Sequence, residues 1–126
     1  MPWTFFKLSE FACLCGCKAN LIQHDFVDKL EHLREALGFP LVVRSGYRCP
    51  AHNARVSTTG ATGPHTTGRA VDVAVFGRQA FLLIEQAMLD GEFTGVGISQ
   101  RGDQARRFIH LDDLSEERFR PTVWSY

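Results

Sequence analysis

The sequence lacks any apolar run long enough to cross a bilayer, and it lacks an excess of charge of either sign. A membrane-spanning helix needs about 18 or more predominantly apolar residues, and no hydrophobic stretch approaches that length. The 14 basic and 14 acidic residues give a formal net charge of zero, whereas a nucleic-acid-binding domain needs a basic surface to neutralise phosphates. We therefore expect neither a membrane nor nucleic acid among the partners.

Internal repeats, low-complexity segments and a recognisable secretory signal are also absent. The first residues, MPWTFFK, contain neither a basic leader nor a long apolar run, so we expect synthesis in the cytoplasm without a signal peptide. A chain of 126 residues can form one domain that buries about two-thirds of its unfolded surface. The expectation is a single monomeric domain over residues 1–126.

Hydrophobic periodicity predicts the secondary structure. Apolar residues recur every three or four positions over 20–37 and over 78–89, which predicts two amphipathic helices. A short helix is expected from His52 to about Val56. Strands are expected in four β-branched or alternating segments: 41–45, 69–75, 93–99 and 106–111. The predicted class is α+β, with a small antiparallel sheet and helices packed on it.

Two features bear on how these elements pack. Glycines alternate with apolar residues within 93–99, which should allow a neighbouring segment to approach the backbone closely. The C-terminal tail carries Phe119, Trp124 and Tyr126, aromatic residues that we expect to cap the core or to line the wall of a cleft.

The strongest chemical signal is the stretch GPHTTGRAVDV at 63–73. Glycine and proline break regular structure ahead of His65, and the small and β-branched residues that follow predict a buried strand with Asp72 at its middle. An unpaired carboxylate in an apolar strand is strongly unfavourable. Asp72 therefore needs a cation, either an arginine or a metal ion.

A second histidine favours the metal. The sequence RFIHLD at 107–112 alternates like a strand, so that His110 and Asp112 share one face. His65, Asp72 and His110 together supply two nitrogens and one oxygen, which suits Zn²⁺ with a fourth position open for water, as in catalytic sites.

A simpler interpretation stays open at this point. Each histidine could be a satisfied core or loop residue, and Asp72 could pair with Arg48 or Arg69. Arg48 has two possible uses, because its planar guanidinium can either grip a peptide carboxylate or amide oxygen or form a structural ion pair.

The four cysteines form a separate motif. Cys13, Cys15 and Cys17 alternate near the start of the chain, and Cys49 follows Arg48. They could hold a second, structural zinc, form a disulfide or remain as thiols, and the C-x-C-x-C spacing differs from that of most zinc knuckles.

Three separated motifs resemble the zinc D-Ala-D-Ala carboxypeptidase and murein endopeptidase family. They are SGYRCPAHN at 45–53, HTTGRAVD at 65–72 and FIHLD at 108–112, and the likeness extends over about 5–126. The branch that it resembles most is the small one of bacteriophages and bacterial murein endopeptidases. The resemblance implies a hedgehog/DD-peptidase-like fold and a single catalytic Zn²⁺. It also implies hydrolysis of an amide bond in the peptide stem or cross-link of peptidoglycan, by D,D-carboxypeptidase or endopeptidase activity.

The resemblance also assigns roles to particular residues. It implies that His65, Asp72 and His110 bind the metal and that Arg48 lies near the substrate. Relatives place an acid or a histidine two or three residues before the last ligand, whereas this sequence has Phe and Arg there. Asp112 is therefore our candidate for the catalytic base, and the alternative is that it orients a histidine.

The resemblance further implies a biological setting. Peptidoglycan stem peptides are the expected partner, and a phage or prophage origin would explain how an enzyme without a signal peptide acts on the cell wall, after release or as part of a virion. The alternatives are a non-catalytic zinc-containing recognition module of the same fold and a structural module of a virion.

Overall fold

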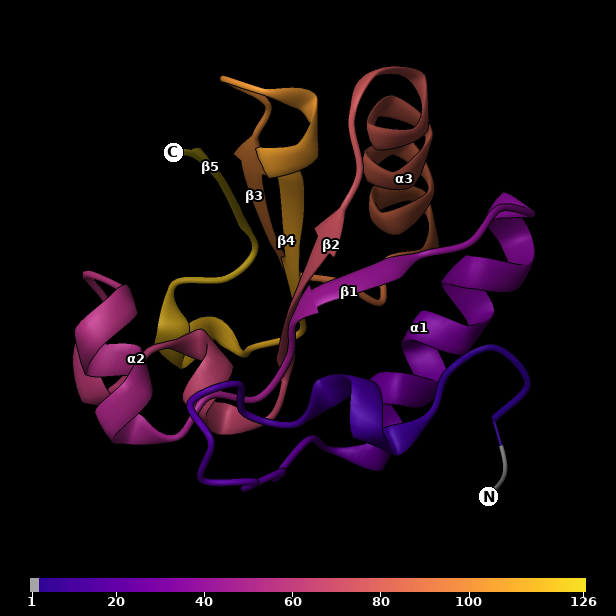
Figure 1. Ribbon diagram of the computed structural model, residues 1–126. Helices are drawn as coiled ribbons and strands as arrows, with labels where there is room; N and C mark the ends of the chain where they lie inside the picture. Colours follow the sequence, from indigo (N-terminus) through magenta and orange to yellow (C-terminus); the bar gives the residue numbers. More distant parts are fainter. Residues whose placement is uncertain (1–2) are drawn as a thin grey trace.

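A five-stranded sheet with the strand order β1-β2-β4-β3-β5 organises the computed structural model, which describes residues 3–126 (Figure 1). The strands are β1 (Val42–Ser45), β2 (Ala70–Ala74), β3 (Gly95–Ser99), β4 (Phe108–Asp112) and β5 (Thr122–Ser125). The first four strands pair antiparallel, as predicted. The fifth strand, β5, was not predicted, and it runs parallel to β3, so the sheet is mixed.

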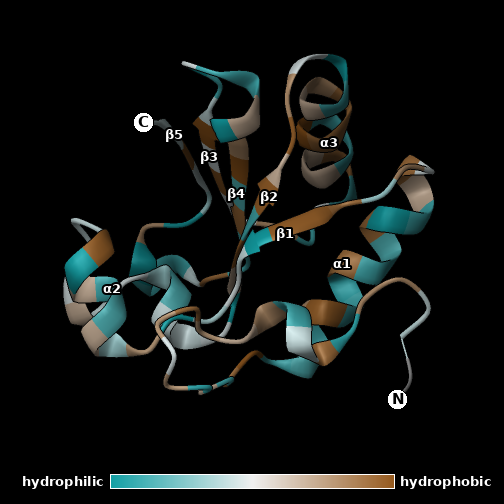
Figure 2. Cartoon of the chain, viewed as in Figure 1, coloured by the Kyte–Doolittle hydropathy of each residue, from teal (hydrophilic) through white to brown (hydrophobic). Residues whose placement is uncertain are grey.

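Two long helices cover one face of this sheet. They are α1 (His24–Leu37) and α3 (Gly77–Asp90), and a shorter helix, α2 (Pro50–Val56), follows β1 in the chain. Both α1 and α3 are amphipathic, with brown and teal residues alternating along them in Figure 2. The helix α1 begins later than the predicted 20–37, because the backbone N–H of Gln23 donates to the carbonyl of Gly68 and this N-cap residue is extended.

Short 3-10 helices lie in the segments before and between these helices and strands. They are η1 (Leu8–Phe11), η2 (Gly60–Thr62), η3 (Pro64–Thr67), η4 (Gln104–Arg106) and η5 (Glu116–Arg118). The η2 and η3 turns lie in the polar, glycine-rich segment between α2 and β2, and η5 lies between β4 and β5. None of the helices in residues 3–126 is both long and apolar enough to cross a membrane.

Because side chains alternate along a strand, the hydrophobic core lies on one face of the sheet and the candidate site residues lie on the other. On β2 and β4, Val71, Val73, Ile109 and Leu111 are buried in the hydrophobic core with residues of α1 and α3. The residues between them in sequence point to the other face of the sheet, because successive side chains on a strand alternate. The central strands therefore have an apolar face against the helices and a second face that carries histidine and aspartate.

Two glycines of β3 leave space for side chains on that second face. Gly95 pairs with Asp112 and Gly97 pairs with His110 across the β3–β4 ladder. A Cβ at Gly95 would overlap the Asp112 carboxylate, and a Cβ at Gly97 would lie 2.7 Å from ring atoms of Trp124. The predicted close approach to the glycines of this strand is thus confirmed.

Candidate metal centre

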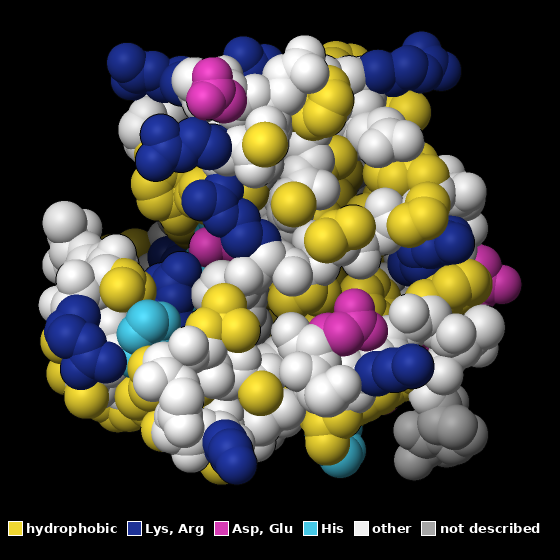
Figure 3. Space-filling view, in the orientation of Figure 1, with side chains coloured by type: hydrophobic (Ala, Val, Ile, Leu, Met, Phe, Trp, Pro, Cys, Tyr) yellow, Lys and Arg dark blue, Asp and Glu magenta, His cyan; other side chains and the backbone are white. Residues whose placement is uncertain are grey.

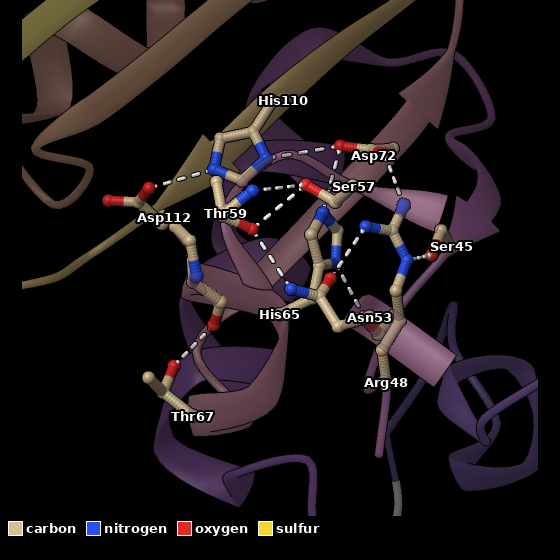
Figure 4. Close-up of polar contacts among 12 residues, drawn as sticks. Ser45, Arg48, Asn53, Ser57, Thr59, His65, Thr67, Asp72, His110 and Asp112 are labelled. Carbon is tan, nitrogen blue, oxygen red and sulfur yellow. Dashed lines mark hydrogen bonds and ion pairs between the residues drawn. The ribbon is translucent and has the colours of Figure 1, made fainter. Parts of the chain in front are cut away.

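The three side chains expected to bind a metal come together on the face of the sheet away from α1 and α3. Nε2 of His65 lies 3.2 Å from Oδ1 of Asp72, and Nδ1 of His110 lies 3.1 Å from the same oxygen. Their potential ligand atoms all lie within 4.8 Å of one another. Figure 4 shows His110 and Asp72 facing each other, with Asp112 on the opposite side of the His110 ring.

Local structure explains this convergence. Asp72 lies directly opposite His110 in the β2–β4 register, so two side chains of adjacent strands meet on one face. His65 is in η3, which ends at Gly68 in the left-handed conformation, with φ at 75°. That conformation favours glycine, and it turns the chain from η3 into β2, so that His65 lies beside Asp72.

The outer nitrogens of both imidazoles are already engaged. Nδ1 of His65 lies 2.7 Å from the carbonyl oxygen of Gly46, and Nε2 of His110 lies 2.7 Å from Oδ2 of Asp112. An oxygen of either kind accepts, so each outer nitrogen carries the proton, and the inner nitrogen of a neutral ring presents a lone pair. Two lone pairs and the carboxylate of Asp72 then face one another, an arrangement that a cation between them would stabilise.

The pKa shifts of Asp72 and His110 also favour positive charge at the site. Burial would raise the pKa of Asp72, but when His110 and His65 are protonated, their hydrogen bonds outweigh burial and hold that pKa well below its usual range. Burial would lower the pKa of His110, but its contacts with Asp112 and Asp72 raise it instead. The site therefore keeps Asp72 anionic and favours positive charge beside it.

The spacing of the three groups fits zinc. With zinc–nitrogen and zinc–oxygen distances of about 2.0–2.1 Å, a tetrahedral ion spaces its ligand atoms about 3.3 Å apart. The two N···O separations, 3.1 and 3.2 Å, are close to that value. Outer hydrogen bonds to a carbonyl and a carboxylate also match those that orient histidine ligands in zinc sites. His65, Asp72 and His110 could thus hold a zinc ion with little rearrangement.

Arg48 fixes the outer oxygen of Asp72. Its Nη2 lies 3.3 Å from Oδ2 of Asp72, while Oδ1 faces the two histidines. The guanidinium is held by Ser45 and Asn53, each at 3.0 Å. Arg48 therefore forms the ion pair with Asp72 considered from the sequence, and it also lines the adjoining cleft.

Asp112 is completely buried behind His110. Besides its bond to His110, its carboxylate accepts two hydrogen bonds from Arg120, at 2.7 and 2.9 Å. Burial opposes ionisation, but the hydrogen bonds from Arg120 and His110 lower the pKa of Asp112 to about 2. The carboxylate is an anion that holds the outer N–H of His110 in place.

Arg69, the other cation considered as a partner for Asp72, lies elsewhere. It pairs with Asp25 and Asp113, each at 2.7 Å. Lys29 also contacts Asp113, at 2.8 Å. This cluster ties α1 to the region just after β4 and does not take part in the candidate centre.

The centre opens into a cleft of about 860 Å³. The cleft is bounded by the segment that follows α2, by η3, by β4 and by the C-terminal segment from η5 onward. Figure 3 shows a hollow between the α2 region and the sheet, where basic and acidic side chains meet. Phe119, Trp124 and Tyr126 line it, so the tail aromatics form a cleft wall, one of the two predicted positions.

The sequence analysis missed two cleft residues, Glu117 and Arg120, and it placed Trp124 at a cleft wall without predicting its contact with His110. Apart from Asp72, Glu117 is the one acidic residue within 3–126 that lines the cleft. Arg120 lines it too, and the ring centroid of Trp124 lies 5.0 Å from that of His110. The alternation in 122–125 is a weak strand signal, but it does not predict a parallel pairing with β3, which brings these residues to the centre.

Comparison with known proteins supplies the family. A family model described as Peptidase M15 matches residues 4–112, which include all three candidate ligands. A search of curated proteins found no match. The matched region covers most of the chain, and the α+β fold and the histidine–aspartate–histidine group agree with it. The chain therefore belongs to the M15 peptidase family, whose members are zinc metallopeptidases.

Proposed function

We propose that this protein hydrolyses an amide bond in the peptide stem or cross-link of peptidoglycan, with one Zn²⁺ bound by His65, Asp72 and His110. The observation that carries the proposal is the pair of inner histidine nitrogens aimed at one carboxylate oxygen, with both outer nitrogens engaged. Membership of the M15 family supports the reaction class. The substrate class rests on the resemblance of the three sequence motifs to cell-wall peptidases.

Zinc in a site of this kind polarises the scissile carbonyl and lowers the pKa of a bound water to about 7. The protein's own groups would orient the substrate and move the proton. Three of the five guanidinium N–H donors of Arg48 hold protein oxygens, which leaves two for a carboxylate or a carbonyl oxygen of the substrate. Stem peptides carry several free carboxylates, so an arginine on the cleft wall suits them.

For Asp112 we propose the orienting role rather than that of catalytic base. Its oxygens are occupied by His110 and Arg120, and it has no exposed surface. A base must reach the water or the leaving group and must exchange its proton. A carboxylate whose pKa is held at about 2 accepts protons poorly near neutral pH.

Glu117 is the residue that we propose as the base. It lines the cleft and is exposed, so its carboxylate can exchange protons with solvent. It lies in η5, between β4, which carries His110, and β5, which carries Trp124. A carboxylate that lines the cleft can take a proton from water and pass it to the leaving amine.

The decisive experiment is digestion of purified sacculi, with mass analysis of the released fragments. We expect wild-type protein to release stem-peptide fragments, a chelator to stop the release and added zinc to restore it. The masses identify which bond is cut. His65→Asn should abolish release, whereas His32→Asn, at an exposed histidine that pairs with Glu92, should not. Absence of any chelator-sensitive release would overturn the proposal and favour a recognition or structural module.

A further inference from the structure

The four cysteines form a compact cluster outside the cleft. Cys13, Cys15 and Cys17 lie in the irregular segment after η1, and Cys49 is the residue before α2. The sulfur of Cys15 lies 3.5 Å from that of Cys13 and 3.7 Å from that of Cys49. All four sulfurs lie within 4.8 Å of one another. Two segments far apart in sequence thus bring every cysteine of the chain to one point.

These sulfur separations match a metal site better than a disulfide. A disulfide holds its sulfurs about 2.05 Å apart, and all four cysteines here are free. A tetrahedral zinc with zinc–sulfur distances of about 2.3 Å spaces its sulfurs about 3.8 Å apart. The separations of 3.5 and 3.7 Å lie near that value.

Backbone N–H groups point at three of the four sulfurs. The N–H of Cys49 donates to Cys13 at 3.3 Å, that of His52 to Cys49 at 3.4 Å and that of Ala19 to Cys17 at 3.4 Å. Hydrogen bonds to a ligand from its surroundings orient it and tune the metal, and a donor stabilises an anionic acceptor most. This independent observation indicates a pocket prepared for thiolates.

We propose that Cys13, Cys15, Cys17 and Cys49 bind a second, structural Zn²⁺. The four thiols would release their protons to solvent on binding, and the closed set of four sulfurs would leave no position for water. This site is separate from the proposed catalytic centre, and its ion would take no part in hydrolysis.

The position of the cluster gives the ion a structural task. The backbone N–H of Tyr47 donates to the carbonyl of Phe11 at 2.8 Å, and the carbonyl of Gly46 accepts from His65 at 2.7 Å. Arg48 directly precedes the cluster residue Cys49. A zinc joining Cys49 to the N-terminal segment would therefore fasten the strand end that supports both His65 and Arg48.

Metal counting on separate variants tests this site. Wild-type protein purified in reductant should contain two zinc ions per chain. The double variant His65→Asn/His110→Asn, the histidine variant, should retain one zinc ion. The double variant Cys15→Ser/Cys17→Ser should lose the zinc ion that the histidine variant retains. It changes the two cysteines of the segment after η1 that are not buried. After reconstitution with Co²⁺, a thiolate-to-cobalt charge-transfer band should appear in wild type and in the histidine variant and should be absent from the cysteine variant.

Several results would overturn the proposal. They are a histidine variant that is folded but free of zinc, a Co²⁺ spectrum without the thiolate band, iron in place of zinc, or cysteines recovered as a disulfide. The histidine variant keeps the test decisive even if the cysteine variant fails to fold. Failure of sacculus digestion alone would count against the proposed reaction and leave the cysteine site standing, so the two proposals fail separately.

Discussion

Oδ2 of Asp112 accepts a hydrogen bond from Nε2 of His110 at 2.7 Å, although the two residues lie only two positions apart on the same strand. The bond is possible because alternate residues of a strand share one face. It places the proton of His110 on the outer nitrogen and leaves the inner nitrogen free to face Asp72. The orientation of a candidate metal ligand is thus set by its neighbour along β4.

Asp112→Asn should weaken zinc binding about 10- to 100-fold, because the amide supports the imidazole less strongly than the carboxylate does. Competition with a chelator of known affinity measures this loss, and saturating zinc should restore most of the cleavage. Asp103→Asn, at an exposed aspartate, is the control and should bind zinc as wild type does. Unchanged zinc affinity with lost turnover would instead make Asp112 the base.

Glu117→Gln should lower kcat about 100-fold or more while zinc content stays unchanged, because an amide cannot take up the proton. Its neighbour Glu116 does not line the cleft, so Glu116→Gln is a closely matched control and should cleave at the wild-type rate. Steady-state kinetics on a soluble stem peptide measures both variants. Equal activity of the two would remove Glu117 from the mechanism.

The Asp112–Arg120 pair should make stability depend on pH. The pKa of Asp112 is about 2 in the folded protein against an ordinary 3.8. A carboxyl group whose pKa is lower in the folded than in the unfolded protein stabilises the fold at pH values above its unfolded pKa. This stabilisation is lost as the pH falls from about 4 toward 2. Arg120→Met should therefore reduce the free energy of unfolding by about 2 kcal/mol at neutral pH, with a smaller difference in acid.

Urea denaturation of zinc-free protein at several pH values measures that difference. Arg101→Met, at an exposed arginine, is the control and should follow the wild-type curve. A gap between Arg120→Met and wild type that stays constant down to the lowest pH would contradict the assignment of the stabilisation to this pair.

Gly97→Ala should destabilise the protein by about 1–3 kcal/mol, the usual range for overpacking. The new methyl group would lie 2.7 Å from ring atoms of Trp124, so the indole must move, and its contact with His110 must change. Trp124→Ala removes the obstacle, and in that background the alanine at position 97 should have little effect. A double-mutant cycle by thermal unfolding measures the coupling, and additive effects would contradict it.

The elements with strong local periodicity were predictable. The helices α1 and α3 and the four strands β1–β4 follow from recurrence every three or four residues or every second residue, which neighbouring residues set by themselves. The position of Asp72 within β2, and that of His110 and Asp112 on one face of β4, could be predicted for the same reason. Helix ends were less certain, as at Gln23, where a bond to Gly68 decides the boundary.

The sequence alone determined the residue types of the centre, namely His65, Asp72 and His110, and the strand faces on which the last two lie. Only the tertiary structure decided which groups surround them. The parallel addition of β5 to β3 brings Trp124 over His110, and chain folding brings Cys49 to the cysteines of the N-terminal segment. These are contacts between distant segments, and spacing along a chain carries no information about them, because they arise from the packing of the whole domain.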